Sequence, residues 1–90
     1  MRITWDVTKD ARNVRKRGVS LGVAEEFDWS TALVRQDTRR DYGEPRFQAL
    51  GFVGRRLHML VFAPRGDHVR VISLRKANRR EVLLYEQYQA

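Results

Sequence analysis

Hydrophobic and polar positions near the start of the chain alternate briefly and then follow a helical spacing. The pattern predicts a short strand over residues 2–5 and a helix to about Arg17, with Asp6 or Thr8 as its N-terminal cap. Gly18 is expected to end this helix because glycine readily adopts the left-handed conformation that closes helices. The residues expected to form its narrow apolar stripe are Val7, Ala11 and Val14.

The following stretch predicts a second helix, a run of strands and a final helix. Ser20 can cap a short helix to about Phe27, beyond which apolar and polar positions alternate as in strands. Gly54-Arg55 suits a two-residue hairpin turn, and residues 64–67 are a second turn signal. The expected strands cover residues 32–36, 47–53, 56–63 and 68–74. Helical spacing returns over residues 76–88, with Ala77, Leu84, Tyr85 and Tyr88 on one side.

This order of elements indicates an α+β fold, because helices and strands are segregated along the chain. We expect an antiparallel sheet of four to five strands, with two N-terminal helices and one C-terminal helix. If the helices cover one sheet face, the other face is free to meet a ligand. No internal repeat or Ser/Gly linker interrupts the chain, so residues 1–90 are expected to form a single domain.

Charge adds a functional indication to this fold. Arginine outnumbers lysine fifteen to three, and the formal net charge is +7. A guanidinium group grips phosphate at two points, so the surplus indicates a phosphate-handling protein acting on RNA. The alternative is a basic protein without a nucleic-acid role. The sequence has no cysteine, no apolar run long enough for a membrane span and no secretion signal, so we expect a cytoplasmic protein without disulfides.

The hairpin turn at Gly54-Arg55 decides which side chains of two strands share a face. It pairs Phe52 with Leu57. One face of the hairpin is then expected to be apolar, formed by Leu50, Phe52, Leu57, Met59 and Val61.

The opposite face of this hairpin is the expected ligand surface. Arg56 and His58 point to it, and Arg70 of the next strand could join them. Residues 39–46 lie near one end of this surface and place a carboxylate among arginines, which is a candidate site. For any single arginine the alternative is a solvated position that prevents strands from associating edge to edge. The charged side chains that this segment contributes include Arg39, Arg40, Glu44 and Arg46.

No motif for a metal ion or a cofactor accompanies these residues. His58 and His68 have no spaced carboxylate or thiol that would complete a zinc site, and the aspartates are too scattered for two magnesium ions. A glycine-rich phosphate loop and a nucleophile elbow are also missing. The remaining possibility for catalysis is phosphodiester cleavage without a metal ion or a cofactor. In the first helix, Lys9, Arg12, Arg15 and Lys16 form either a further phosphate contact or a solvated face.

Three stretches in series cover nearly the whole chain. The first is Trp5-Asp6-x-x-Lys9-x-x-x-Asn13-x-x-Lys16-x-Gly18. The second is Tyr42-Gly43-Glu44-x-Arg46 with Gly51 and Gly54-Arg55 after it, and the third is Arg70-x-Ile72-Ser73-x-Arg75-Lys76-Ala77-Asn78 followed by Glu81 and Tyr85. Together they resemble the BrnT family, the toxin halves of bacterial type II toxin-antitoxin pairs, which belong to the wider RelE-like ribonuclease fold.

The resemblance implies a cytoplasmic ribonuclease that inhibits translation by cutting RNA. It also implies a cognate antitoxin, expected to be of the ribbon-helix-helix type, so that promoter DNA is bound only through the complex. Position by position, the residues that match the family's basic and acidic stretches are Glu44, Arg46, Arg70 and Arg75, with Arg55 or Arg56 as the hairpin arginine. The family usually has histidine at Arg17 and tyrosine near Phe62, so neither position supplies an imidazole or a phenol here.

RNA carries its own nucleophile, the 2′-hydroxyl, so the protein must remove one proton, align the phosphate and stabilise the added negative charge. As a hypothesis, Glu44 is the general base, with His58 as the alternative base or acid. Arg46, Arg56 and Arg70 would hold the phosphate, and Arg75 would steady the leaving 5′-oxygen. The expected RNA-binding residues are Arg39, Arg40, Arg55, His58 and Lys76. The competing hypothesis is a noncatalytic module that only binds RNA or DNA, such as a co-repressor.

Overall fold

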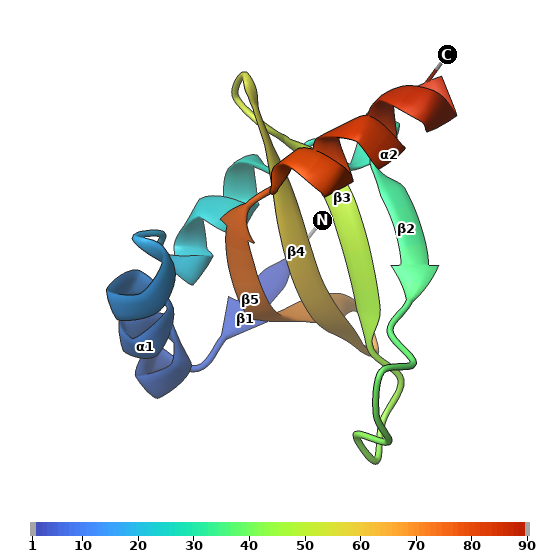
Figure 1. The fold of residues 1–90 in the computed structure, drawn as a ribbon. Coiled ribbons are helices and arrows are strands. Elements are labelled where there is room, and N and C mark those ends of the chain that lie inside the picture. The colour runs from blue at the N-terminus through green and yellow to red at the C-terminus, as the bar shows by residue number, and fades with distance from the viewer. Residues whose placement is uncertain (1, 90) are drawn as a thin grey trace.

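A five-stranded sheet with the strand order β1-β5-β4-β3-β2 forms the centre of the structure (Figure 1). The computed structural model describes residues 2–89. The strands are β1 (Ile3–Trp5), β2 (Leu33–Gln36), β3 (Phe47–Val53), β4 (Arg56–Arg65) and β5 (His68–Lys76). The helices are α1 (Val7–Arg17), the 3₁₀ helices η1 (Leu21–Glu26) and η2 (Trp29–Thr31), and α2 (Arg79–Gln89).

The predicted α+β class is confirmed, but the expectation of an antiparallel sheet is wrong. β2, β3, β4 and β5 are antiparallel, whereas β1 pairs in parallel with β5 and places Ile3 beside Val69. Tight turns join β3 to β4 and β4 to β5, and such turns impose antiparallel pairing. β1 is joined to β5 only through the rest of the chain, so no turn fixes its direction and the sheet is mixed.

Local capping confirms most of the expected element boundaries. Asp6 caps α1 by accepting a hydrogen bond from the Lys9 N–H (3.0 Å), and Gly18 ends it with φ 73°. Ser20 caps the second helix as expected, although that helix is a 3₁₀ helix rather than an α-helix. Gly54 has φ 61°, which fits the two-residue turn with glycine first.

The first face of the sheet packs against η1 and η2, and α1 lies beside the edge of β5. Phe27 lies against Gly51, where a Cβ atom would be only 2.4 Å from the ring Cζ, so only glycine fits at this position. The same ring makes an edge contact with Trp29, with centroids 4.9 Å apart. The buried apolar residues of this face include Ile3, Leu21, Ala24, Phe27, Ala49, Leu60, Phe62, Val69, Val71 and Leu74.

The second face is partly covered by α2, which crosses in front of β3 and β4 (Figure 1). The expectation that all helices lie on one face is therefore wrong. Tyr85 of α2 is 6% exposed and its hydroxyl donates to the Thr31 carbonyl oxygen (2.7 Å), whereas Tyr88, which was expected on the same apolar side, is 67% exposed. The buried residues beneath α2 include Leu50, Leu57, Met59 and Ala77. No helix within residues 2–89 is both long and apolar enough to span a bilayer.

α1 is attached to the sheet by a polar side chain and not by the expected apolar stripe. Val7 and Val14 are 81% and 46% exposed, and Asn13 is the buried residue of the helix. Pairing with β1 ends at Val71, so the outer edge of β5 lacks a strand beyond that point. Asn13 takes its place at Leu74, donating to the carbonyl oxygen (2.7 Å) and accepting from the N–H (3.4 Å). The amide of Asn13 thereby satisfies the N–H and the carbonyl oxygen of Leu74, which would otherwise be unpaired at the edge of β5.

Asn13→Ala is expected to lower the free energy of unfolding by about 2–4 kcal/mol, because it leaves buried backbone groups of β5 without partners. Urea unfolding followed by tryptophan fluorescence measures this change. Arg15→Ala, at an exposed position of the same helix, is the matched control and should change the value by no more than about 0.5 kcal/mol. Equal, small changes in both variants would show that the amide does not hold α1 in place.

Candidate functional site

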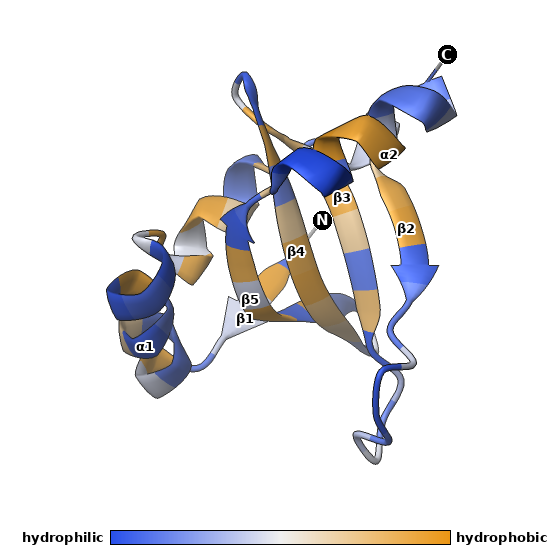
Figure 2. Ribbon diagram, viewed as in Figure 1, coloured by the Kyte–Doolittle hydropathy of each residue, from blue (hydrophilic) through white to orange (hydrophobic). Residues whose placement is uncertain are grey.

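α2 covers only the end of the second face that is nearest the β3–β4 turn. From the residues at the edge of α2 outward, the backbone register arranges side chains in rows across β2, β3, β4 and β5. Figure 2 shows hydrophobic colour beneath α2 giving way to hydrophilic bands on β2 and β3. The first row contains Leu33, Leu50, Met59 and Arg75, and the second contains Arg35, Gln48, Val61 and Ser73.

The third row brings together two of the predicted site residues. Arg70 pairs with Ala63, and Arg46 directly precedes Phe47, which pairs with Phe62. Arg46 and Arg70 therefore lie two strands apart on the same face, with Cα atoms about 10 Å from each other. Side chains of this length can reach one phosphate from both sides. We call this exposed part of the second face, with Arg35, Arg46, Arg70 and Arg75, the arginine face.

Arg75 is fixed by the first turn of α2. Its two terminal nitrogens donate to the two carboxylate oxygens of Glu81, each at 2.8 Å. This pair lowers the pKa of Glu81 and raises the pKa of Arg75. Glu81 also forms a capping box with Asn78: each side-chain oxygen accepts from the other residue's N–H, at 2.8 and 2.9 Å. The position of Arg75 is thus tied to the start of α2.

Glu44 lies at the end of the arginine face, between two arginines. Its carboxylate accepts a hydrogen bond from Arg65 and lies 3.6 Å from Nε of Arg46. The hydrogen bond from Arg65 is the main cause of a lowered pKa for Glu44. Nε of Arg46 is buried and makes no hydrogen bond within residues 2–89. A buried donor without a hydrogen-bond acceptor is unfavourable, and the negative charge of the Glu44 carboxylate beside it partly offsets this cost.

Asp37 organises the loop that carries these two residues. Its side chain is 1% exposed and accepts from the N–H, Nε and Nη2 of Arg39 and from the Tyr42 hydroxyl. The hydrogen bonds from Arg39 hold the pKa of Asp37 far below its usual range. The Tyr42 ring in turn lies 4.2 Å from the guanidinium carbon of Arg46. Asp37 therefore helps to fix Arg46 through Tyr42.

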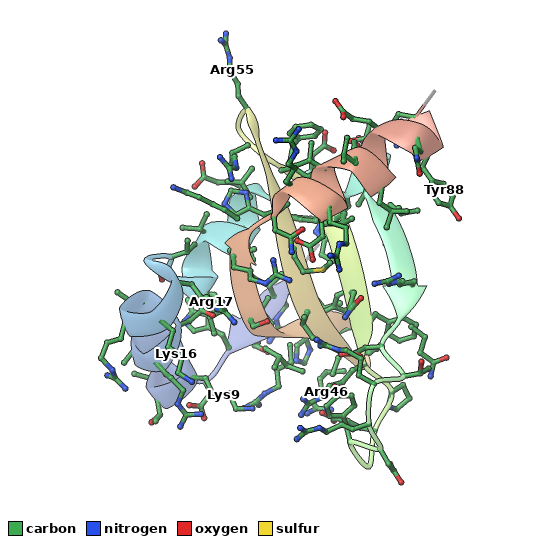
Figure 3. All side chains as sticks on the ribbon, viewed as in Figure 1. Lys9, Lys16, Arg17, Arg46, Arg55 and Tyr88 are labelled. Atoms are coloured by element: carbon green, nitrogen blue, oxygen red, sulfur yellow. The ribbon has the colours of Figure 1, made fainter. Side chains whose placement is uncertain are left out.

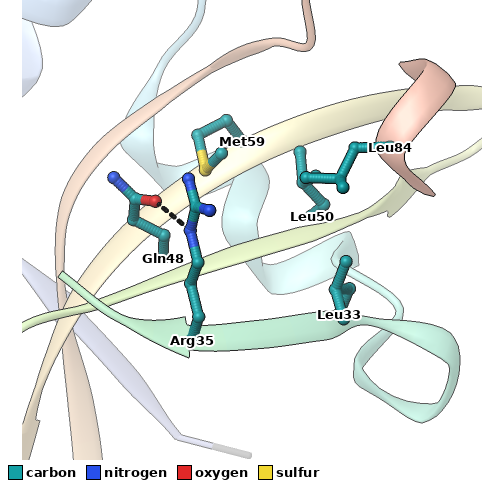
Figure 4. A pocket seen from close by; sticks show the side chains of 6 residues that line it. All are labelled: Leu33, Arg35, Gln48, Leu50, Met59 and Leu84. Atoms are coloured by element: carbon teal, nitrogen blue, oxygen red, sulfur yellow. Dashed lines mark hydrogen bonds between the residues drawn. The ribbon is translucent and has the colours of Figure 1, made fainter. Parts of the chain in front are cut away.

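Arg35 is oriented by its neighbour on β3. Nε of Arg35 donates to Oε1 of Gln48 (2.9 Å), beside a small apolar cavity that Leu84 of α2 closes (Figure 4). The cavity volume is about 20 Å³, which is the size of a single water molecule and too small for a ligand. The contact therefore contributes to the site by directing Arg35 and not by forming a pocket.

Two predicted residues lie away from the arginine face. Arg56 is at the opposite end of β4, seven residues and about 20 Å from Ala63, where its Nη2 donates to the Ala77 carbonyl oxygen (3.3 Å). His58 is 5% exposed and points to the first face opposite Gly51, with Nδ1 bonded to the Arg56 carbonyl oxygen. Arg56 and His58 therefore lie opposite the apolar residues Leu57 and Met59, as expected, but that face is the first face, which η1 and η2 cover. Arg70 lies on the second face, so the expectation that it joins them is wrong.

The predicted RNA-binding residues are also dispersed. Arg39 and Arg40 belong to the loop at the end of the arginine face. Arg55 projects from the hairpin tip away from the body of the molecule (Figure 3), and Lys76 lies in a cleft beside Arg75. Among residues 2–89, no three His, Asp or Glu side chains form a group that could hold a metal ion.

Sequence reasoning missed four polar residues of the site. Positions 48, 50 and 52 alternate on one side of β3, so Gln48 belongs to the face of Leu50 and could have been assigned there. No pattern in the sequence indicated Arg65, because its contact with Glu44 depends on how the loop between β2 and β3 folds. The missed residues are Arg35, Gln48, Arg65 and Ser73.

The geometry defines a class: a small, basic α+β protein that presents a row of arginines and a paired carboxylate on one sheet face. Comparison with family models agrees with this class and makes it specific. The model described as the ribonuclease toxin BrnT of a type II toxin-antitoxin system matches residues 5–81. The chain belongs to this family, as the sequence resemblance predicted, and the family implies an antitoxin partner. A search of the curated proteins gives no match.

Asp37→Asn is expected to destabilise the protein by about 1–3 kcal/mol, because the amide nitrogen meets donors of Arg39 or Tyr42 and the buried negative charge is lost. The lowered pKa means that the carboxylate's contribution is present above the unfolded value, near 3.9, and disappears as the pH falls through the folded value. Urea unfolding at pH 7 measures the loss. Asp41→Asn is the control, because Asp41 is an exposed residue of the same loop.

Proposed function

We propose that this member of the BrnT family is a metal-independent endoribonuclease that inhibits translation by cutting RNA. The single observation that supports it best is the third row of the arginine face, which contains Arg46 and Arg70, with Glu44 beside Arg46. Permanently charged donors that are held in place before the reaction stabilise a developing phosphorane charge strongly. Arg46 is held against Tyr42, and Arg70 lies 3.7 Å from the Asp6 carboxylate.

In the proposed reaction, Arg46 and Arg70 hold the scissile phosphate and its nonbridging oxygens. Glu44 removes the proton from the 2′-hydroxyl, whose oxygen attacks phosphorus in line with the leaving 5′-oxygen. The bond from phosphorus to that oxygen breaks, and the oxygen takes a proton from solvent. The products are a 2′,3′-cyclic phosphate and a 5′-hydroxyl. Arg75 lies two rows, about 13 Å along the strands, from Arg46 and Arg70, so it adds positive charge on the leaving-group side at longer range.

The arrangement replaces one part of the mechanism expected from the sequence. Arg56 is too far from Arg46 and Arg70 to hold the same phosphate. Arg35 and Ser73 lie in the next row and supply donors that the sequence did not indicate. The proposed phosphate site therefore consists of Arg46 and Arg70, with Arg35 and Ser73 beside it.

The proposed cellular setting follows from the family. A cognate antitoxin, of the ribbon-helix-helix type, would neutralise the toxin in the cytoplasm and would carry the pair to promoter DNA. An acidic segment of that antitoxin could cover the arginine face and exclude RNA, and opposite charges would make its association fast. We also propose that the fold is RelE-like.

Arg70→Ala is expected to reduce the turnover of a defined RNA by about 100-fold, because it removes one preorganised donor from the phosphate. Arg55→Ala is the matched control at the hairpin tip and should leave turnover within about twofold. The assay follows cyclic-phosphate ends by gel electrophoresis, with and without a metal chelator, and uses a substrate with one deoxynucleotide at the cut site as a second control. Undiminished cutting of the deoxy substrate would refute attack by the 2′-hydroxyl.

If the protein binds RNA without cutting it, the alternative function, a noncatalytic nucleic-acid-binding module, is favoured. A noncatalytic module would hold RNA through the arginine face and would lose affinity gradually with each arginine removed. Its salt slope would fall by about one unit for each phosphate contact that is lost. Wild-type protein that binds RNA and yields no cyclic-phosphate ends would overturn the ribonuclease proposal.

If Glu44 is the general base, kcat/KM should depend on pH in a specific way. A base acts in its ionised form, and the pKa of Glu44 is lowered, mainly by Arg65. The value of kcat/KM should therefore fall only at a pH below the ordinary glutamate range near 4.3 and stay flat from about pH 5 upward. Glu44→Gln should reduce kcat by about 100-fold or more. An acid limb near pH 6.5 would instead indicate a histidine base.

A further inference from the structure

α1 runs along the edge of β5 and leaves a groove between the two elements. Two clefts of about 260 and 530 Å³ occupy it, one over Ile72 and Ser73 and the other beside Lys76 and Asn78. Lys16 and Arg17 line both clefts, so the two are adjacent, and we call them together the α1–β5 groove. Figure 3 labels Lys9, Lys16 and Arg17 on the side of α1 that faces β5. The cations that line the groove are Lys9, Arg12, Lys16, Arg17, Arg75 and Lys76.

The charge of this groove is not neutralised by the protein. Within residues 2–89 no Asp or Glu lines either cleft, and of its six cations only Arg75 forms an ion pair. The aspartates of α1 are engaged elsewhere: Asp6 caps the helix, and Asp10 accepts from the Ser20 hydroxyl (3.0 Å) and the Leu21 N–H (2.7 Å). Clustered like charges repel one another, so an anion from outside would be attracted here.

The lining residues favour phosphate groups over an acidic protein segment. Ile72 is the apolar side chain among them, and the larger cleft is lined entirely by polar side chains. A protein partner normally buries apolar groups at the centre of its interface, which this groove does not offer. Guanidinium, ammonium and hydroxyl donors are instead the groups that contact phosphate oxygens in nucleic-acid complexes.

The groove also continues from the arginine face. Arg75 belongs to the first row of that face and lines the larger cleft beside Lys76. In the proposed reaction, Arg75 lies on the side of the leaving 5′-oxygen. A strand that passes Arg75 after the cut site would therefore enter the groove, where Lys16 and Arg17 come next.

We infer that the α1–β5 groove binds the backbone phosphates of the RNA strand on the 3′ side of the cut. This inference rests on the proposed function for its direction, because the leaving-group side defines which part of the strand meets Arg75. The groove adds a second set of phosphate contacts to those made by Arg46 and Arg70. Substrates that extend past the cut site are thus bound more tightly than short ones.

The test compares two double variants that lose the same charge. Lys16→Gln/Arg17→Gln removes two groove cations, whereas Arg15→Gln/Arg80→Gln removes two exposed arginines that line neither cleft. Glutamine keeps the helix propensity close to that of lysine and arginine. The probe is a fluorescent 2′-O-methyl RNA, which lacks the nucleophile and is not cut. Binding is measured by anisotropy over a range of salt concentrations, with strands of about three and about twelve nucleotides.

The groove variant should bind the longer strand about tenfold more weakly than the wild type. Its slope of log K against log salt should fall by about 1.4, because each phosphate contact of a single strand contributes about 0.7. The control variant should keep the wild-type slope, and both variants should bind the short strand alike. Thermal unfolding of both variants within a few degrees of the wild type shows that the fold is retained.

Four results would overturn the inference or separate it from the proposed function. Equal losses in the groove and control variants would show that only net charge matters. Tighter binding of a polyglutamate peptide than of RNA, lost in the groove variant alone, would assign the groove to an acidic protein segment. If the groove variant binds and cuts RNA normally, the groove inference is wrong and the ribonuclease proposal stands. If the groove variant loses RNA binding but the wild type does not cut RNA, the groove is an RNA-binding site and the ribonuclease proposal is wrong.

Discussion

The side chain of Asn13 is the contact on which the rest of the arrangement depends. β5 is paired with β1 only as far as Val71, and the amide of Asn13 satisfies the backbone of Leu74 beyond that point. One residue thereby closes an open sheet edge, which is otherwise a site of unwanted strand pairing. It also fixes α1 beside β5 with Lys16 and Arg17 facing the groove, so the same contact sets both the fold and the placement of charge.

The cations of this protein are held in two different electrostatic settings. Near the loop, Arg39, Arg46 and Arg65 are close to carboxylates that hold them in position. Along the α1–β5 groove the cations lack such partners within the described residues, apart from Arg75. Paired arginines suit a step that needs fixed geometry, and unpaired cations suit attraction of a flexible polyanion. In the proposed function, the paired arginines act in the chemical step and the unpaired cations bind the RNA strand.

The second face of the sheet serves the core and the site at once. α2 covers its apolar end, and the capping box that starts α2 uses the same Glu81 that binds Arg75. The face expected to be free, that of Arg56 and His58, is instead the face that η1 and η2 cover. The arginine face lies on the side expected to be apolar, and only its part beyond α2 is open to a ligand, which excludes Arg56 and includes Arg35.

Local chemistry in the sequence determined the class of fold, the strand positions, the caps at Asp6 and Ser20, the glycine turns and the strongly basic charge. These features depend on neighbours within a few residues, whereas the family resemblance rests on three stretches spread over nearly the whole chain. The tertiary structure alone decided which arginines converge. β4 is buried on both faces, so alternation could not show which side is open, and a register shift at Val61/Phe62 changes the side to which Arg70 points relative to Arg75. The direction of β1 and the docking of α2 were likewise set by packing between distant segments, which no local pattern encodes.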